Sequence, residues 1–449
     1  MAVLVDKGVR HTLFSMAFPM LAGTFAMNAY SLTDTWFVAQ LGTLPLAAMG
    51  FIFPVVMLLT CVAMGIGSGV TALTSHAIGR HDHADSARLV THGLTLMMSV
   101  SAVLTVAGCL TIDPVFRKLG ADDRTMPYIH DFMRVWYFGA VFMALPMVGN
   151  GILISAGDSK AASRFMILGT VLNAVLNPIM IFGFLGFPAL GIRGSALATV
   201  VAQAVSTVWL FQLLRTKHRL VDFAGWRFAE WLGSARRIAR FAIPGILSMV
   251  LMPVSATVIT KIVSGYGAEA VAAVGAASRI EMFAFMIPMA LGMSLTPFIS
   301  QNFGAERMDR VREAMTLSTR FALLYGAGIA VVFFLTAPWL ARVFTGDPKV
   351  LAVLVAYIRI ISFGYGMMEV HRYCGFMMTG MHRPVYSTLL NALRVIVLLI
   401  PLVFLGSRLF GIHGVFWGRL ATDLIAGGVG IFWVSRILGL KLNGAPAKP

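Results

Sequence analysis

The feature that most constrains this chain is the recurrence, from one end to the other, of apolar segments long enough to cross a lipid bilayer. A hydrocarbon core about 30 Å thick takes roughly 20 residues of helix to cross. We therefore expect an all-α polytopic membrane protein with twelve transmembrane helices and no sizeable soluble domain. The apolar windows between polar loops place these helices at residues 11–40, 44–75, 89–112, 127–155, 164–184, 190–214, 239–264, 269–300, 319–343, 351–378, 386–405 and 412–437.

The composition agrees with a chain immersed in lipid. Hydrophobic residues make up 58% of the chain and charged residues only 12%, with a mean hydropathy of +0.83, which is too apolar for a water-soluble protein of this size. The net charge of +16 would suggest a nucleic-acid partner in a soluble protein. Here the basic residues gather in short loops between apolar runs, so they indicate membrane orientation and we expect no nucleic-acid partner.

The distribution of basic residues predicts that both termini are cytoplasmic in the cell inner membrane. The first apolar run follows Lys7 and Arg10 and continues to about Leu41 without a cleavage site, so we expect it to be a retained helix. With the N-terminus inside, most lysines and arginines fall in cytoplasmic loops. The outer loops carry only Arg117, Lys118, Arg124, Arg193, Arg342, Lys349 and Arg408.

The two halves of the sequence are related by a shift of 225 positions. Single glycines could serve only close helix packing, but that does not explain their shared spacing. We expect two pseudo-symmetric six-helix lobes, residues 1–220 and 239–449, joined by an amphipathic cytoplasmic linker at 221–238. An even number of helices in each lobe predicts alternating access by rocking of the lobes. The matched pairs include Pro19 with Pro244, Gly42 with Gly267, Gly50 with Gly275, Gly67 with Gly292, Gly79 with Gly304 and Arg134 with Arg359.

Four oxygen-bearing side chains of the first lobe lie at similar expected depths in the membrane. Asp34 precedes the outer end of its helix at Leu41 by seven residues, which places it about 10 Å below the surface. Asn177 and Thr199 lie about as deep in the fifth and sixth helices, and Asn173 is one turn from Asn177 on the same face. An ionisable residue at this depth costs about 2.5 kcal/mol or more unless it faces a cavity or a partner. The set therefore predicts a cation or proton site.

Two coupling ions fit this set. A carboxylate between apolar walls can alternate between its protonated and charged forms as access switches sides, whereas sodium would need several oxygen ligands, which Asn173, Asn177 and Thr199 could supply. Ordinary hydrogen bonding between helices is an equally good explanation for these three residues. It is a weaker one for Asp34, because no basic residue lies one turn away. The shift of 225 places Ile259 opposite Asp34, so we expect coupling to reside in the first lobe.

The second lobe carries intramembrane charges in a different pattern. Glu281, Glu369, Arg394 and Asp423 fall near mid-depth in their helices and are candidates for lining a substrate cavity. Arg419 and Asp423 are four residues apart and are expected to pair along one helix. Glu369 and Arg394 lie at comparable depths, so we expect a second ion pair between them, which could serve to lock the bundle.

Several classes of site have no signature in the sequence. Cys61, Cys109 and Cys374 lie in apolar stretches with a spacing that fits neither a disulfide framework nor a zinc site. We find no phosphate-binding Gly-Lys-Ser/Thr loop, no His-Glu-x-x-His pair and no serine-centred elbow. We therefore expect a protein that is not an enzyme, with no metal and no cofactor other than a coupling ion, H⁺ or Na⁺.

Ordered motifs along almost the whole chain resemble those of the multidrug and toxic compound extrusion family. Each motif alone is weak, and the specificity comes from their order and coverage. In the first half they are Ser31-Leu-Thr-Asp34-Thr-Trp-Phe-Val-Ala-Gln-Leu-Gly42, Leu172-Asn-Ala-Val-Leu-Asn177-Pro178 and Gly191-Ile-Arg-Gly-Ser-Ala-Leu-Ala-Thr199, and in the second Ala276-Ala-Ser-Arg-Ile-Glu281 and Pro297-Phe-Ile-Ser-Gln301-Asn-Phe-Gly304.

This resemblance implies twelve helices in two lobes, an outward V-shaped cavity, and export of cationic, often aromatic compounds driven by inward proton or sodium flow. It also implies that Asp34, Asn173, Asn177 and Thr199 form the cation site of the first lobe. Some branches have an aspartate at the position of Asn177, so the amide here has one charge fewer for sodium. The acid expected on the seventh helix of one branch is absent, which makes the chain similar to the DinF-like branch, named for a DNA-damage-inducible protein, and favours protons.

Other functions fit the sequence less well. A flippase for lipid-linked precursors, from the same superfamily, would need more basic residues to hold pyrophosphate than Arg279, Arg394 and Arg419 provide. A membrane-embedded enzyme would need a cluster of catalytic groups near one interface, and a channel does not need the two-lobe repeat. We expect a monomer in membrane lipid that exports small amphipathic or cationic organic compounds.

Overall fold

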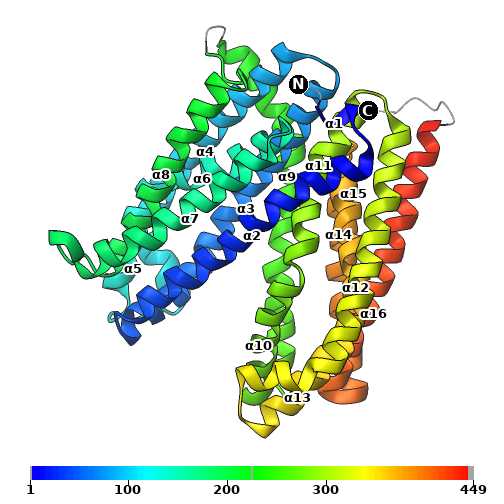
Figure 1. Cartoon of the computed structure of the whole chain (residues 1–449). Helices are drawn as coiled ribbons and strands as arrows, with labels where there is room; N and C mark the ends of the chain where they lie inside the picture. The colour runs from blue at the N-terminus through cyan, green and yellow to red at the C-terminus, as the bar shows by residue number, and fades with distance from the viewer. Residues whose placement is uncertain (1–2, 224–225, 443–449) are drawn as a thin grey trace. The chain divides into compact units, whose positions relative to one another are not determined.

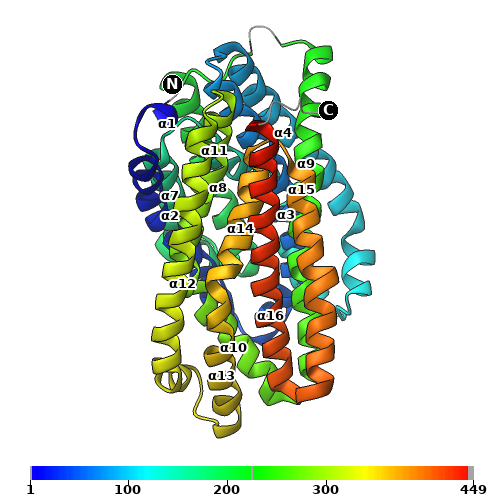
Figure 2. The same ribbon diagram turned by 90° about the vertical axis from the view of Figure 1, so that its right-hand side faces the viewer.

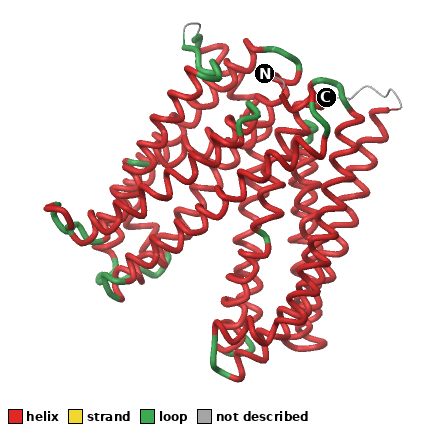
Figure 3. The backbone as a smooth tube through the Cα atoms, viewed as in Figure 1, coloured by secondary structure: helices red, strands yellow, loops and turns green. Residues whose placement is uncertain are grey.

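A computed structural model describes residues 3–223 and 226–442 of the chain, and within those ranges it consists of helices and short loops without any strand (Figure 3). In chain order the elements are α1 (Val3–Asp6), α2 (Val9–Ala39), α3 (Thr43–Gly79), α4 (His83–Lys118), α5 (Met126–Phe138), α6 (Ala140–Ser155), α7 (Ser159–Phe182), η1 (Phe184–Gly186), α8 (Ile192–Thr216), α9 (Phe228–Ser264), α10 (Ala268–Ala284), α11 (Met286–Gly304), α12 (Met308–Phe344), α13 (Pro348–Ile361), η2 (Ser362–Gly364), α14 (Tyr365–Gly380), α15 (Pro384–Ala392), the π-helix η3 (Leu393–Leu399) and α16 (Ile400–Leu442).

These elements form the twelve membrane-spanning segments that the sequence predicts. Among the described residues, eight segments are long and apolar enough to cross a bilayer, and ten if each of two bent helix pairs is one span. The last of them, Pro384–Gly439, is divided at Phe410 and Gly411, whose backbone angles are not helical, and so supplies two spans. Helix α2, with 31 residues, is about 46 Å long and completes the set.

Two of the expected straight helices are bent. Residues 127–155 form α5 and α6, which meet at 54°, and residues 269–300 belong to α10 and α11, which meet at 56°. At the second bend Pro288 has no N–H to donate to the carbonyl of Ala284, and Tyr325 OH donates to that carbonyl instead, at 2.7 Å. The hydropathy pattern continues through both bends because both halves of each pair are apolar.

The chain forms two compact units. Among the described residues, the first comprises residues 3–6, 15–223 and 226–246, and the second comprises Lys7–Phe14 and residues 247–442. The described part of the expected linker, 221–223 and 226–238, therefore lies in the first unit, and α9 carries residues of both. Within the first unit α3 packs on α6 and α7 on α8, and within the second α14 packs on α12 and α16 (Figures 1 and 2).

The internal repeat is visible in the backbone. Positions 225 apart adopt the same rare left-handed conformation, which lets the chain turn sharply between spans. The break between α5 and α6 lies at Gly139, and the equivalent Gly364 lies in η2 between α13 and α14. Each unit therefore repeats the same sequence of turns. The matched φ angles are 111° at Gly42 and 102° at Gly267, 59° at both His81 and Glu306, and 79° at Gly157 and 62° at His382.

Candidate functional site

Three helices of the first unit, α2, α7 and α8, bring together the four polar residues that the sequence predicts. Asp34 lies on the last third of α2, Asn173 and Asn177 lie one turn apart on α7, and Thr199 lies near the start of α8. Helices α7 and α8 are in extensive contact. The short loop between them, which contains Gly183 and Gly191 with φ of 79° and 57°, returns the chain so that these two helices lie side by side.

The four side chains form one continuous hydrogen-bonded network. Asn177 Nδ2 donates to Asp34 Oδ1 at 3.2 Å and to Asn173 Oδ1 at 3.0 Å. Asn173 Nδ2 in turn donates to Thr199 Oγ1 at 3.0 Å. The carboxylate is thereby linked through two amides to a hydroxyl more than a helical turn away, in a polar path across three helices.

Within the described chain, the network has one hydrogen-bond acceptor without a donor, and no basic side chain belongs to it. The side chains of Asn173 and Asn177 are fully buried and Asp34 is half-buried. Among the described residues, Asn177 Oδ1 finds no hydrogen-bond partner, which is costly for a buried carbonyl oxygen. No lysine, arginine or histidine of the described chain pairs with Asp34. Other carboxylates of the described chain do form ion pairs with basic side chains. The arrangement can therefore accept a proton or a small cation.

Two members of the network were not predicted from the sequence. Ser195 Oγ donates to Asp34 Oδ1 at 2.8 Å, the shortest contact that the carboxylate makes, and Tyr30 OH donates to Thr199 Oγ1 at 3.1 Å. The signal was present, since Ser195 lies one turn before Thr199 and Tyr30 one turn before Asp34, each on the same helical face.

The intramembrane charges of the second unit pair differently from the prediction. Arg394 Nη2 lies 2.6 Å from Asp423 Oδ1, so Arg394 does not pair with Glu369, and Asp423 does not pair with Arg419. Glu369 Oε1 pairs with Arg372 at 3.0 Å, three residues away. Asp423 on α16 can pair with Arg394 on η3 because these two helices are in contact.

The fourth candidate, Glu281, belongs to a cluster with Arg419 and two tyrosines. Arg419 Nη2 lies 2.8 Å from Glu281 Oε1, and the hydroxyls of Tyr357 and Tyr365 donate to the same oxygen at 3.0 Å and 3.3 Å. Arg419 also donates to Tyr357 OH. Within the described ranges, Glu281, Glu369 and Asp423 thus each have an arginine partner, whereas Asp34 in the first unit has none.

The match to a known protein family identifies the kind of protein that carries this site. The family model described as MatE matches residues 19–179 and 244–405, one match in each half of the repeat. The chain belongs to the MATE family of transporters. As a MATE transporter it is a multi-pass membrane protein, and it is not an enzyme.

Individual relatives cover this MATE transporter almost completely. It is 34% identical over 435 residues to a FAD transporter of Shewanella oneidensis, covering 97% of this chain and 96% of that protein. It is 21% identical over 433 residues to the multidrug export protein MepA of Staphylococcus haemolyticus, covering 96% and 94%. The crystal structure of the Vibrio cholerae MATE transporter VcmN in the bent form superimposes with a TM-score of 0.91 at 27% identity, covering 96% and 97%.

Outside the membrane, the loop before α7 of this MATE transporter is fixed to the end of α8. Asp158 caps α7 by accepting from the Ala161 N–H at 3.0 Å, and its other oxygen lies 2.5 Å from Lys217 Nζ and 3.3 Å from His218 Nε2. Burial alone would raise the pKa of Asp158, but the hydrogen bonds from Lys217 and Ala161, together with the attraction of the nearby positive charge, hold the pKa below its usual range. Burial lowers the pKa of His218 in spite of the nearby carboxylate.

Within the part of the chain that the structure describes, no three histidine, cysteine, aspartate or glutamate side chains gather into a set that could hold a metal ion. The side chains bonded to Asp34, Ser195 and Asn177, are neutral, so a cation at Asp34 would meet one carboxylate together with neutral oxygens. Such a donor set suits a proton or a monovalent cation better than a divalent one.

Proposed function

We propose that this MATE transporter is a secondary active exporter in which entry of a proton at Asp34 drives a small amphipathic or cationic molecule out of the cell. The observation that carries the proposal is the Asp34 network in the first unit, where a carboxylate is bonded to a serine and an asparagine and no described lysine, arginine or histidine pairs with it. A carboxylate with a permanent cationic partner would stay charged through the cycle. Asp34 is free to change its charge when access switches.

The ion pairs of the second unit support the proposal that ion coupling resides in the first unit. Glu281, Glu369 and Asp423 each lie within 3.0 Å of an arginine nitrogen, and breaking a buried pair leaves a charge without compensation. These carboxylates are better suited to holding the bundle together. Their candidacy as cavity residues, together with that of Arg394, stays a prediction.

Protons are favoured over sodium as the coupling ion. Sodium would need several oxygen ligands around Asp34, and of the two amides only Asn177 has an unengaged oxygen, Oδ1, while Asn173 Oδ1 already accepts from Asn177. A proton needs only the carboxylate. Membership of the DinF-like branch, which the sequence motifs favour, would agree with this choice.

The substrate has two candidates. Cationic or amphipathic drugs are favoured by the similarity to MepA, whose name describes multidrug export. A flavin dinucleotide is the second candidate, because the FAD transporter of Shewanella oneidensis is 34% identical over nearly the whole chain. A flippase for lipid-linked precursors is less favoured, since Arg394 and Arg419 are engaged by carboxylates and are not free to hold a pyrophosphate.

The cell inner membrane, two cytoplasmic termini and a monomeric state complete the proposal. The cytoplasmic position of the termini is supported by the excess of basic residues in the loops assigned to the cytoplasm. The MATE membership adds the multi-pass topology. No cofactor other than the coupling ion is proposed.

The test is transport in proteoliposomes that contain the purified full chain and carry either a pH gradient or a sodium gradient. Ethidium and FAD are offered separately as substrates, and the native protein is compared with Asp34→Asn. We expect uptake of one substrate under the pH gradient only, and its loss in the variant. Undiminished uptake by Asp34→Asn under both gradients would overturn the coupling assignment, and uptake of FAD without ethidium would favour the second candidate.

A further inference from the structure

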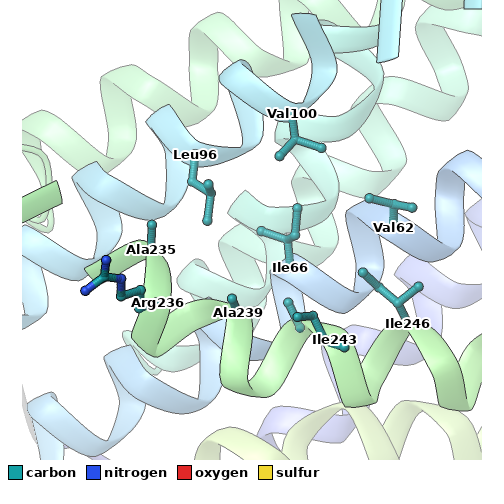
Figure 4. Close-up of a pocket in the computed structure, with 10 residues that line it drawn as sticks. Val62, Ile66, Leu96, Val100, Ala235, Arg236, Ala239, Ile243 and Ile246 are labelled. Carbon is teal, nitrogen blue, oxygen red and sulfur yellow. The ribbon is translucent and has the colours of Figure 1, made fainter. Parts of the chain in front are cut away.

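An apolar groove of about 380 Å³ lies on the first unit between α3, α4 and the first half of α9 (Figure 4). Val62 and Ile66 of α3 and Leu96 and Val100 of α4 form two of its walls, each as a pair one turn apart. The wall from α9 runs from Ala235 and Arg236 to Ile246. Figure 4 shows Arg236 at one end of the lining residues and Ile246 and Val62 at the other.

The hollow results from small side chains on a helix that is held in place. Helix α9 presents Ala235, Ala239 and Ala242 at helical spacing toward the groove, where methyl groups leave space between the larger residues of α3 and α4. The start of α9 is fixed to α4 by hydrogen bonds. Trp231 Nε1 donates to Thr95 Oγ1 at 3.0 Å, and Ser234 Oγ lies 2.9 Å from His92 Nδ1. The helix therefore cannot move in to close the groove without breaking these bonds.

The groove has one charged residue, at one end. Arg236 is exposed, and no carboxylate among the described residues pairs with it. Its neighbour Arg237 is engaged by both oxygens of Asp85, at 3.0 Å and 3.1 Å, so the local acid is already occupied. The remaining lining residues are all hydrocarbon. A ligand that fits must therefore be apolar along its length and anionic at one end.

We propose that this groove binds one acyl chain of an anionic phospholipid, with the lipid phosphate on Arg236. From Arg236 to Ile246 is ten residues of helix, or about 15 Å, which is half of a hydrocarbon core about 30 Å thick and so matches the chain of a single leaflet. A basic residue at the mouth of an apolar cleft between membrane helices is a recognition pattern for acidic headgroups. A cationic drug would be repelled by Arg236.

The proposed transport cycle is not needed for this binding. Only the assignment of the bound lipid to the cytoplasmic leaflet depends on the proposed orientation of the chain in the membrane. The experiment therefore measures lipid binding alone, so that failure of the lipid site and failure of the transport assignment are distinguishable.

The test is native mass spectrometry of the purified, delipidated full chain in detergent, equilibrated with phosphatidylglycerol or with phosphatidylcholine of the same acyl chains. Arg236→Gln removes the charge, Ala239→Phe fills the groove, and Arg240→Gln is the matched control, because Arg240 is an exposed arginine one turn further along α9 that does not line the groove. Glycerol 3-phosphate is added as a headgroup without chains, and ethidium as a cationic competitor.

We expect one phosphatidylglycerol to be retained about fivefold more strongly than phosphatidylcholine, because one arginine attracts a net anionic headgroup, whereas the choline cation of phosphatidylcholine offsets the charge of its phosphate. Arg236→Gln should abolish that preference, Ala239→Phe should weaken both lipids, and Arg240→Gln should leave both within twofold. Glycerol 3-phosphate should not displace the lipid. Equal retention of the two lipids, an equal effect of Arg240→Gln, or displacement by ethidium would overturn the proposal. If Ala239→Phe does not fold, the comparison of the two arginine variants decides.

Discussion

The hydroxyl of Ser195 donates a hydrogen bond of 2.8 Å to the carboxylate of Asp34, across 161 positions of sequence. This contact joins α8 to α2 within the first unit, and it is shorter than the contact from Asn177 at 3.2 Å. A hydrogen bond to a charged group contributes about 1.5 to 3 kcal/mol. Ser195 therefore stabilises the charged form of Asp34, which in the proposed mechanism is the form that remains after the proton is released.

We predict that Ser195→Ala lowers the transport rate under a fixed pH gradient roughly tenfold, because the charged carboxylate loses its strongest neutral donor. Residual activity should remain, since Asn177 still donates to Asp34. Initial rates of substrate uptake in proteoliposomes measure the effect. Ser206→Ala is the matched control, because Ser206 is a fully buried serine of the same helix that bonds only the carbonyl of Ala202. Equal losses in both variants would show that a buried serine matters only for packing.

Asp34→Asn should abolish coupled transport while leaving the fold intact. The amide keeps the size of the carboxylate and can still accept from Ser195, but it cannot change its charge with pH. Uptake driven by a pH gradient should fall to the rate of empty liposomes, and the thermal midpoint should change by only a few degrees. Asp123→Asn is the control, because Asp123 is 87% exposed in a loop and should leave transport unchanged. Transport in Asp34→Asn equal to that of the control would contradict the prediction.

The sequence predicted the four central residues of this network because their depths follow from helix length. Asp34, Asn173, Asn177 and Thr199 each lie a countable number of residues from a helix end, and polar residues at such depths need partners. Ser195 and Tyr30 were missed because serine and tyrosine are common in membrane helices, and only the rotation of α2 against α8 brings Ser195 to Asp34 and Tyr30 to Thr199.

The partners of the second unit could not be predicted for a related reason. Arg419 and Asp423 are one turn apart on α16, which makes a pair along the helix the simplest expectation. In the structure each turns to a different helix, Arg419 to Glu281 on α10 and Asp423 to Arg394 on η3. Pairing between helices depends on how they pack, and the spacing along one helix does not contain that information.

Removal of one partner from the Arg394 and Asp423 pair should destabilise the protein strongly. Asp423 is fully buried and Arg394 is largely buried, so Arg394→Met leaves a carboxylate without compensation, at a cost of about 3 to 5 kcal/mol. The double variant Arg394→Met with Asp423→Leu removes both charges and should recover most of the loss. Thermal unfolding of the purified protein in detergent measures both.

The control for these single and double variants is Arg279→Met, because Arg279 is exposed and forms no ion pair with any described residue. It should change stability by less than about 0.5 kcal/mol. The prediction fails if the double variant is less stable than Arg394→Met, since the two charges would then contribute separately.

Stability should fall with decreasing pH in two windows set by the loop before α7. The pKa of His218 is lowered by burial, so the unfolded chain binds a proton from about pH 6.5 downward while the folded chain does not. The pKa of Asp158 is also lowered, so its contribution is present above the ordinary carboxyl pKa of about 3.9 and is lost below it. Both groups therefore favour the folded state more at high pH than at low pH.

We predict that His218→Gln removes the upper window and Asp158→Asn the lower one, seen in the thermal midpoint of the full chain between pH 8 and pH 3. Asp158→Asn keeps the cap of α7, because an amide oxygen can still accept from the Ala161 N–H, whereas Asp158→Ala loses both cap and ion pair. At neutral pH Asp158→Ala should therefore be about 1 kcal/mol less stable than Asp158→Asn. Equal stability of the two variants would mean that the hydrogen bond to Ala161 does not hold α7, and an unchanged pH profile in Asp158→Asn would mean that Lys217 does not lower the pKa of this carboxyl group.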